Sequence, residues 1–131
     1  MNTSHTVRQY MTPDVISFKP ETDVHNAIDT LLKFRISGAP VLNDVGDVVG
    51  VLSIKDCLKV AFGASYHREP AGRVSEIMSY PVHMIDADSD IVEVAEHFLN
   101  SQYRRFPVTS DGHLVGVISR YDVLRALTEL W

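Results

Sequence analysis

The sequence has little that would anchor or cross-link it outside a cell interior. Cys57 is the single cysteine among 131 residues, so no internal disulfide can form. The longest apolar run, Val48 to Leu52, is far shorter than the about 20 residues that span a bilayer. The segment from Met1 to Gln9 has neither an apolar core nor a cleavage pattern, so we expect no signal peptide. We therefore expect a cytoplasmic protein with no membrane contact.

Positive charge is also in short supply. The chain has 12 Lys and Arg against 17 Asp and Glu, which gives a net charge of −5. A general nucleic-acid binder depends on neutralising phosphates, so we expect no nucleic-acid partner. A local cationic pocket for one small anion remains compatible with this balance.

The motifs of common catalytic and metal sites are missing as well. There is no Gly-x-Ser-x-Gly elbow and no Gly-Lys-Ser or Gly-Lys-Thr phosphate loop. The stretch Asp86 to Asp90 imitates a calcium loop, but Ile91 and His97 stand where such a loop needs Gly and Glu. One cysteine and six scattered histidines do not suggest a zinc site. We expect no catalytic residue, no metal site and no cofactor, and predict that the protein is not an enzyme.

An internal repeat is what the sequence does contain. Two seven-residue segments resemble each other, and each is predicted to be the corner at which a buried strand turns through a Ser into a helix. They are Gly50-Val51-Leu52-Ser53-Ile54-Lys55-Asp56 and Gly116-Val117-Ile118-Ser119-Arg120-Tyr121-Asp122. Further matches extend over nearly the whole chain: Val7 with Val74, Met11 with Met78, Asp23 with Asp90, Pro40-Val41 with Pro107-Val108, and Asp44 with Asp111. In this alignment Tyr10 and Ile77, each directly before the aligned methionine, occupy the same position. Two copies of one unit make up most of the protein.

Each copy is predicted to run strand, helix, strand, strand, helix. In the first copy we expect a strand at 15–18, a helix opened by Asp23 and ended by Gly38, strands at 39–42 and 48–52, and a helix at 54–62. In the second we expect a helix opened by Asp90, strands at 106–109 and 114–118, and a helix at 120–130. The closing helices are expected to bury Cys57, Leu58 and Ala61, and Val123, Leu124 and Leu127.

These elements predict an α+β fold of two repeats, residues 1–62 and 74–131, joined by a polar linker at 63–73. Neither repeat alone offers enough core for independent stability. We therefore expect the two repeats to pack against each other about a pseudo-two-fold axis.

Each Ser-x-x-Asp corner allows two interpretations. In the structural one, Ser caps the helix and Asp, in the first turn, interacts favourably with its free N–H groups and dipole. In the functional one, Asp accepts hydrogen bonds from a ribose diol while Ser and the helix start face a phosphate. Both can hold together, because a cap orients groups that a ligand then uses.

The chain resembles a tandem pair of cystathionine-β-synthase (CBS) domains, a Bateman module, here expected to stand alone. The likeness rests on these segments: Met11-Thr12, Met78-Ser79, Ile36-Ser37-Gly38-Ala39-Pro40-Val41, Tyr103-Arg104-Arg105-Phe106-Pro107-Val108, and the two Gly-x-x-Ser-x-x-Asp corners. The resemblance implies two ligand clefts, each joining the corner of one repeat to early strands of the other. It also implies that the Asp of each corner is a ribose anchor.

The resemblance assigns residues to each cleft. The first would contain Ser53, Lys55, Asp56, Ser79, His83, Tyr103, Arg104 and Arg105. The second would contain Thr12, Ile16, Ile36, Ser37, Ser119, Tyr121 and Asp122. Because the first gathers three cationic side chains, we expect it to be the better nucleotide site. The second is expected to bind more weakly or to take a less charged ligand.

The resemblance implies a regulatory module that senses AMP, ADP or ATP, forms a homodimer and passes the change to an unknown regulated protein. Three alternatives stay open: a purely structural dimerisation module with vestigial clefts, a sensor of S-adenosylmethionine, NAD or a metal ion, and a nucleotide-handling enzyme with His83 as its base. The ligand, the use of both clefts, the regulated partner and the dimer orientation are not determined by the sequence.

Overall fold

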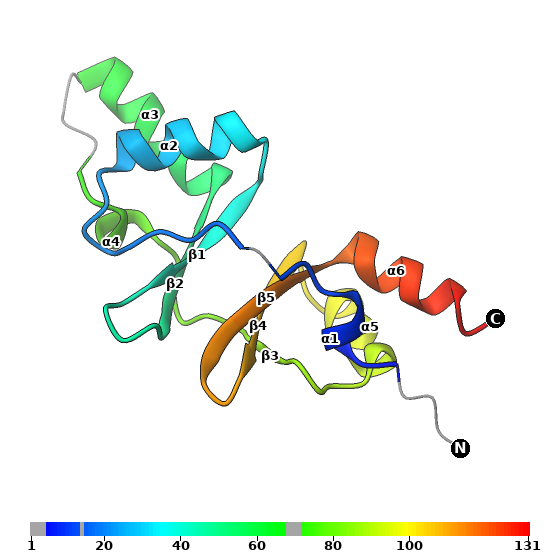
Figure 1. Cartoon of the computed structure of the whole chain (residues 1–131). Helices are drawn as coiled ribbons and strands as arrows, with labels where there is room; N and C mark the ends of the chain where they lie inside the picture. Colours follow the sequence, from blue (N-terminus) through cyan, green and yellow to red (C-terminus); the bar gives the residue numbers. More distant parts are fainter. Residues whose placement is uncertain (1–4, 14, 68–71) are drawn as a thin grey trace. The chain divides into compact units, whose positions relative to one another are not determined.

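The computed structural model describes residues 5–13, 15–67 and 72–131, and its chain forms two compact units (Figure 1). We call Ile16–Val82 the central unit, and Met1–Val15 together with His83–Trp131 the terminal unit. Neither unit coincides with one sequence repeat. The short segment that opens each repeat belongs to the unit built by the other repeat.

The central unit surrounds an antiparallel pair of strands, β1 (Gly38–Leu42) and β2 (Val48–Ser53). Helices α2 (Val24–Phe34) and α3 (Ile54–His67) lie beside this pair, and the short helix α4 (Val74–Ile77) completes the unit (Figure 1). Asp23 caps α2 by accepting a hydrogen bond from His25 N at 2.8 Å, as predicted. The core is made by Phe18, Ala27, Leu31, Ala39, Val41, Leu52, Cys57 and Val74.

The terminal unit has a three-stranded sheet in the order β3 (Ile85–Asp86), β4 (Arg105–Ser110), β5 (His113–Ser119). Strand β3 runs parallel to β4, and β5 runs antiparallel to it. Helices α1 (Val7–Tyr10), α5 (Ile91–Leu99) and α6 (Arg120–Thr128) complete the unit. Asp90 caps α5 by accepting from Val92 N at 2.8 Å. Buried residues from all these helices and strands form its core, including Val7, Val94, Phe106, Ile118 and Val123.

The opening segment of each repeat pairs with the strand that leads into the other repeat's corner. In the central unit, Val51 and Ser79 exchange two backbone hydrogen bonds of 3.0 and 2.9 Å. In the terminal unit, Thr12 and Val117 do the same at 2.9 and 3.0 Å. Each repeat therefore supplies the edge of the other repeat's sheet.

Glycine is required where this exchange brings a methionine onto a strand. A methyl group added at Gly50 would lie 2.9 Å from Met78 Cγ, and one added at Gly116 would lie 2.8 Å from both Met11 Sδ and the Thr12 carbonyl oxygen. Such approaches are closer than ordinary van der Waals contact, so a side chain here would force the segments apart. The same Gly–Met contact thus occurs once in each unit.

Three predictions about secondary structure need correction. Residues 15–18 form no regular strand, and Phe18 makes only a single parallel bridge to Val41. At the corresponding place in the other repeat, β3 pairs with β4 over two residues. Helix α2 ends at Phe34 with Arg35 in the left-handed conformation (φ 52°), whereas Gly38 already belongs to β1. Helix α3 continues to His67 into the predicted linker, of which residues 68–71 lie outside the described residues.

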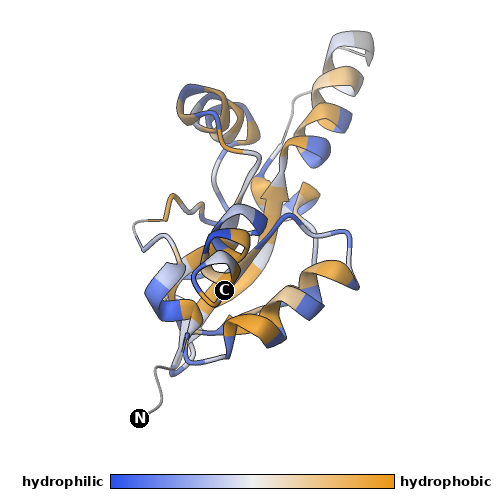
Figure 2. Cartoon of the chain, turned by 90° about the vertical axis from the view of Figure 1, so that its right-hand side faces the viewer, coloured by the Kyte–Doolittle hydropathy of each residue, from blue (hydrophilic) through white to orange (hydrophobic). Residues whose placement is uncertain are grey.

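The burial predictions hold in part. Cys57 and Val123 are buried and Leu127 packs against the core, but Leu58, Ala61 and Leu124 are exposed. Apolar residues recur along the helices, as the orange segments of Figure 2 show. In the described part of the chain, none of the helices is long and apolar enough to cross a membrane.

Candidate functional site

The first corner lies where β2 ends at Ser53 and α3 begins at Ile54. Asp56 N donates to Ser53 Oγ at 3.0 Å, and Ser53 N donates to Asp56 Oδ2 at 3.1 Å. This is a reciprocal capping box in which Asp takes the place that Glu or Gln usually holds. The structural interpretation of the corner is therefore confirmed, and it positions the Asp56 carboxylate beside the first turn of α3.

Ser79 reaches the same carboxylate from the second repeat. Its hydroxyl oxygen lies 3.3 Å from both Oδ1 and Oδ2 of Asp56. Asp56 is half-buried, while Ser79 and Lys55 are exposed. The first corner thus presents a carboxylate, a hydroxyl and an ammonium group at a helix N-terminus, where the helix dipole favours anions. These groups can hold a polar ligand that carries both hydroxyl and anionic parts.

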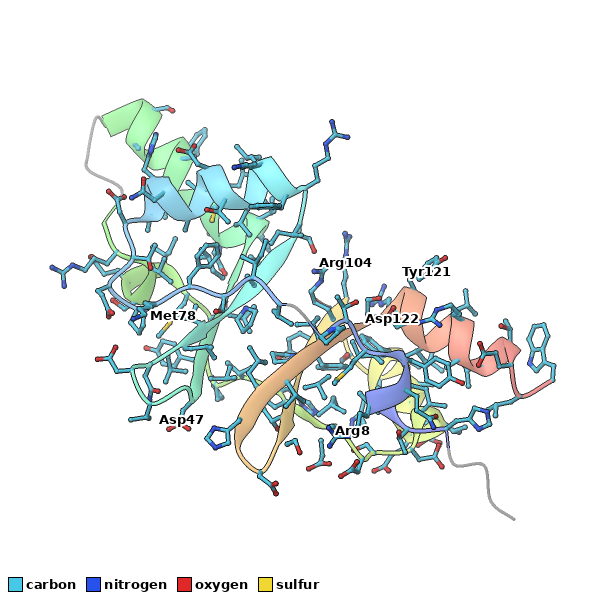
Figure 3. All side chains as sticks on the ribbon, viewed as in Figure 1. Arg8, Asp47, Met78, Arg104, Tyr121 and Asp122 are labelled. Atoms are coloured by element: carbon cyan, nitrogen blue, oxygen red, sulfur yellow. The ribbon has the colours of Figure 1, made fainter. Side chains whose placement is uncertain are left out.

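The second corner repeats the capping box where β5 ends at Ser119 and α6 begins at Arg120. Asp122 N donates to Ser119 Oγ at 3.2 Å, and Asp122 Oδ2 accepts from Ser119 N at 2.9 Å and from Ser119 Oγ at 3.0 Å. Thr12 lies beside Val117, two residues before this cap. Tyr121 is exposed in the first turn of α6, next to the partly buried Asp122 (Figure 3).

Sequence reasoning missed a group of residues that surrounds the second corner. Arg125 Nη2 lies 3.9 Å from Asp122 Oδ1 and donates to the Tyr10 carbonyl oxygen at 3.3 Å. The Tyr10 hydroxyl donates to Glu129, and this hydrogen bond, burial and the Glu129 charge raise the pKa of Tyr10, although Arg125 acts in the opposite direction. The one available signal was a basic residue three positions after the corner Asp, on the same helix face.

Four residues predicted for the first cleft belong to the terminal unit. The His83 and Tyr103 rings lie 5.1 and 5.3 Å from the Phe106 ring between centroids. The Arg104 carbonyl oxygen accepts from Arg120 N at 3.2 Å, which places Arg104 at the start of α6 (Figure 3). The Nε of Arg105 is buried and has no hydrogen-bond partner among the described residues, so it is an unsatisfied donor inside the protein.

Three residues predicted for the second cleft belong to the central unit. Ile16 and Ile36 pack against its core, and the Ser37 carbonyl oxygen accepts from Ile54 N at 2.9 Å. The structure thus brings together Ser53, Asp56 and Ser79 in one unit, and Ser119, Asp122 and the backbone of Thr12 in the other. The membership of the remaining residues in a joint cleft stays a prediction.

The chemistry of both corners is that of hydrogen bonding and charge. Within the residues that the structure describes, no group of three or more His, Cys, Asp or Glu side chains is arranged to hold a metal ion. Each corner offers carboxylate acceptors beside a helix start, and the first adds the Lys55 ammonium group. This arrangement suits a ligand with adjacent hydroxyl groups and a phosphate.

Comparison with known proteins gives a consistent result. The family model described as CBS domain matches the chain twice, at residues 7–63 and 74–129. The uncharacterized protein MJ1225 of Methanocaldococcus jannaschii is 27% identical over 125 residues, which cover 95% of this chain and 44% of that protein. The chloroplastic CBS domain-containing protein CBSX1 of Arabidopsis thaliana is 29% identical over 154 residues, covering 96% of this chain and 65% of CBSX1. The chain therefore spans less than two thirds of either relative's length.

Solved structures share the fold over almost the full chain. The crystal structure of CBSX2, a protein of Arabidopsis thaliana, in complex with AMP matches with a TM-score of 0.85 at 29% identity. The match covers 96% of this chain and 98% of that one. The CBS domain pair of protein MJ0100 matches with a TM-score of 0.80 at 21% identity, which shows a shared fold.

Proposed function

Because the chain belongs to the CBS domain family and contains two such domains, we propose that it is a non-catalytic regulatory module that senses an adenosine-containing ligand such as AMP, ADP or ATP. The observation that carries this proposal is the Asp56 carboxylate, held at the start of α3 with the Ser79 hydroxyl 3.3 Å away. The AMP complex of CBSX2, a protein of the same fold and 29% identical, supports the choice of ligand.

In this proposal, Asp56 accepts hydrogen bonds from the ribose diol, while Lys55 and the start of α3 face the phosphate. His83, Tyr103, Arg104 and Arg105 contribute to the same site. The second site uses Ser119, Tyr121 and Asp122 together with Thr12, Ile16, Ile36 and Ser37. A cytoplasmic location is part of the proposal.

We also propose that the module works as a homodimer and acts on an unidentified partner protein. Large apolar side chains are exposed on four helices: Leu32 and Leu58 in the central unit, and Leu99 and Leu124 in the terminal unit. A second copy of the chain would remove this surface from water. If ligand binding favours one packing of the dimer, the partner must change ligand affinity by the same factor, because linkage is reciprocal.

A purely structural module is the alternative that a specific observation favours. Both corner carboxylates already cap their helices, which is a sufficient reason for an acidic residue at each position. That alternative predicts a dimer whose stability does not respond to any nucleotide.

A thermal melt against AMP, ADP, ATP, S-adenosylmethionine, NAD and guanine nucleotides separates the two. A ligand present at 100 times its dissociation constant stabilises the native state by about 2.7 kcal/mol. For a chain of this size, each kcal/mol raises the melting temperature by about 3–6 °C. We expect a shift with adenine nucleotides that is lost in Asp56→Ala and kept in Asp44→Ala, a change of an exposed acidic residue. No shift with any compound would sink the sensor proposal.

A further inference from the structure

The two corners differ in which further group contacts their carboxylates. At the first corner, the neutral Ser79 hydroxyl lies 3.3 Å from both Oδ1 and Oδ2 of Asp56. At the second, Asp122 Oδ1 faces the Arg125 guanidinium at 3.9 Å. The Asp122 side chain is 13% exposed and Arg125 is 46% exposed, so water screens this pair partially. The carboxylate of the first corner thus has a neutral partner and that of the second has a cation, although Ser79 aligns with Thr12 and Arg125 with Lys59.

Arg125 is held in position from its other side by Tyr10. Its Nη2 donates to the Tyr10 carbonyl oxygen at 3.3 Å, and its guanidinium carbon lies 5.4 Å from the centre of the Tyr10 ring. The Tyr10 hydroxyl in turn donates to Glu129. Hydrogen bonding and a cation–π contact together keep the guanidinium beside Asp122.

The first corner has different residues at the equivalent places. Lys59 follows Asp56 by three positions, as Arg125 follows Asp122, and Ile77 aligns with Tyr10. Lys59 is exposed, and Ile77 packs against the core and has neither ring nor hydroxyl group. Arg125 contacts both the Tyr10 carbonyl oxygen and Asp122 through Nη2, and a lysine lacks the planar guanidinium that also lies near the Tyr10 ring.

We propose that Arg125 is a specificity-determining residue of the second corner, which competes with a ligand's ribose diol for Asp122 and so weakens the binding of adenosine compounds there. This inference rests on the proposed function, because it assumes that the corner carboxylates anchor a ribose. A diol must displace a cation from Asp122 but a neutral hydroxyl from Asp56. Removal of the Arg125 charge should therefore strengthen adenosine binding at the second corner. If the second cleft bound weakly because it has too few cations, the same removal would weaken binding.

Isothermal titration with adenosine tests this inference without interference from phosphate charge. In an Asp56→Asn background, which leaves the second corner as the binding site, Arg125→Gln is expected to raise adenosine affinity by about three- to tenfold. With 2′,3′-dideoxyadenosine, which lacks the diol, the same substitution gives no gain. The matched control is Lys59→Gln in an Asp122→Asn background, with unchanged adenosine affinity.

Arg125→Gln also removes the hydrogen bond to the Tyr10 carbonyl oxygen in α1, so two further variants separate its effect on binding from an effect on the fold. Arg125→Lys keeps the charge without the planar group that lies near the Tyr10 ring, so its adenosine affinity should lie between those of the parent and Arg125→Gln. The double change Lys59→Arg with Ile77→Tyr transfers the arrangement to the first corner and should weaken adenosine binding there. Equal or weaker adenosine binding in both folded Arg125 variants would overturn the role of Arg125. An unsubstituted protein that binds neither adenosine nor any nucleotide would instead overturn the proposed function.

Discussion

The Ser79 hydroxyl oxygen lies 3.3 Å from both carboxylate oxygens of Asp56, although 23 positions separate the two residues. The backbone of Ser79 is held by two hydrogen bonds to Val51, in the strand that leads to the corner. The corner of the first repeat is therefore completed by a residue of the second. This relationship makes the edge segment and the ligand-facing carboxylate parts of one structural arrangement.

Replacing Ser79 by Ala should lower the free energy of unfolding by about 1 kcal/mol or less, because one partly exposed hydrogen bond to Asp56 is lost. Urea denaturation of the ligand-free protein measures this change. Ser75→Ala, at an exposed position of α4, is the control and should be close to neutral. Equal destabilisation in both variants would show that the Ser79 hydroxyl has no special role.

Replacing Gly116 by Ala should destabilise the protein by about 1–3 kcal/mol, because the new methyl group would lie 2.8 Å from the Thr12 carbonyl oxygen. Gly63→Ala is the matched control. Nothing lies within 4 Å of a methyl group at Gly63 inside α3, so this change should stabilise by about 0.5–1 kcal/mol. Thermal or urea unfolding gives both values, and the same sign for both variants would contradict the argument.

Stability should fall as pH rises above 10, in part through Tyr10. The hydrogen bond to Glu129, then burial and the Glu129 charge, raise the pKa of Tyr10 in the folded state. Between the ordinary pKa of tyrosine, 10.0, and the raised value, the unfolded chain loses a proton that the folded chain keeps. The stabilisation from Tyr10 is fully present below its ordinary pKa and is lost as the pH rises through its raised pKa in the folded protein. Urea unfolding of Tyr10→Phe at pH 9 and 11 should give a smaller decrease than the unsubstituted protein, and an identical decrease would exclude this origin.

Cys57 should react slowly with a thiol reagent such as Ellman's reagent in the folded protein at pH 8. Burial, and secondly the Asp56 charge, raise the pKa of its thiol, and its side chain is buried in the central core. We expect a rate lower by about tenfold or more than in urea-unfolded protein, because reaction requires both opening and ionisation. Equal rates in the two states would show that the central core does not protect this residue.

Leu124→Glu should weaken a homodimer by about tenfold or more in dissociation constant, because it places a charge on the exposed apolar face of α6. Sedimentation velocity over a range of concentrations measures the effect. Val45→Glu, at an exposed apolar residue of the hairpin turn, is the control and should leave the dimer intact. A protein that is monomeric before any substitution would contradict the dimer proposal.

Local hydrogen bonding explains what was predicted correctly. Asp23 and Asp90 accept from backbone groups two residues later, so the start of each helix depends on neighbours in the sequence. The β1–β2 turn is equally local, since Asn43 Oδ1 accepts from Val45 N and Asp47 N. The strand at residues 15–18, the end of the first helix at Gly38 and the burial of Leu58 and Leu124 were predicted wrongly. These features depend on packing against residues far away in the sequence.

The sequence by itself determined the repeat, the caps, the two hairpins and the family, because each rests on contacts between near neighbours or on the order of short motifs. The resemblance to the family, rather than any local signal, predicted that one repeat would reach the other's corner. Tertiary structure alone decided that Met78 and Met11 press on Gly50 and Gly116, and that Arg125 and Tyr10, 115 positions apart, meet beside Asp122. The physical reason is that such partners are selected by the fold of the whole chain, and no short-range pattern records them.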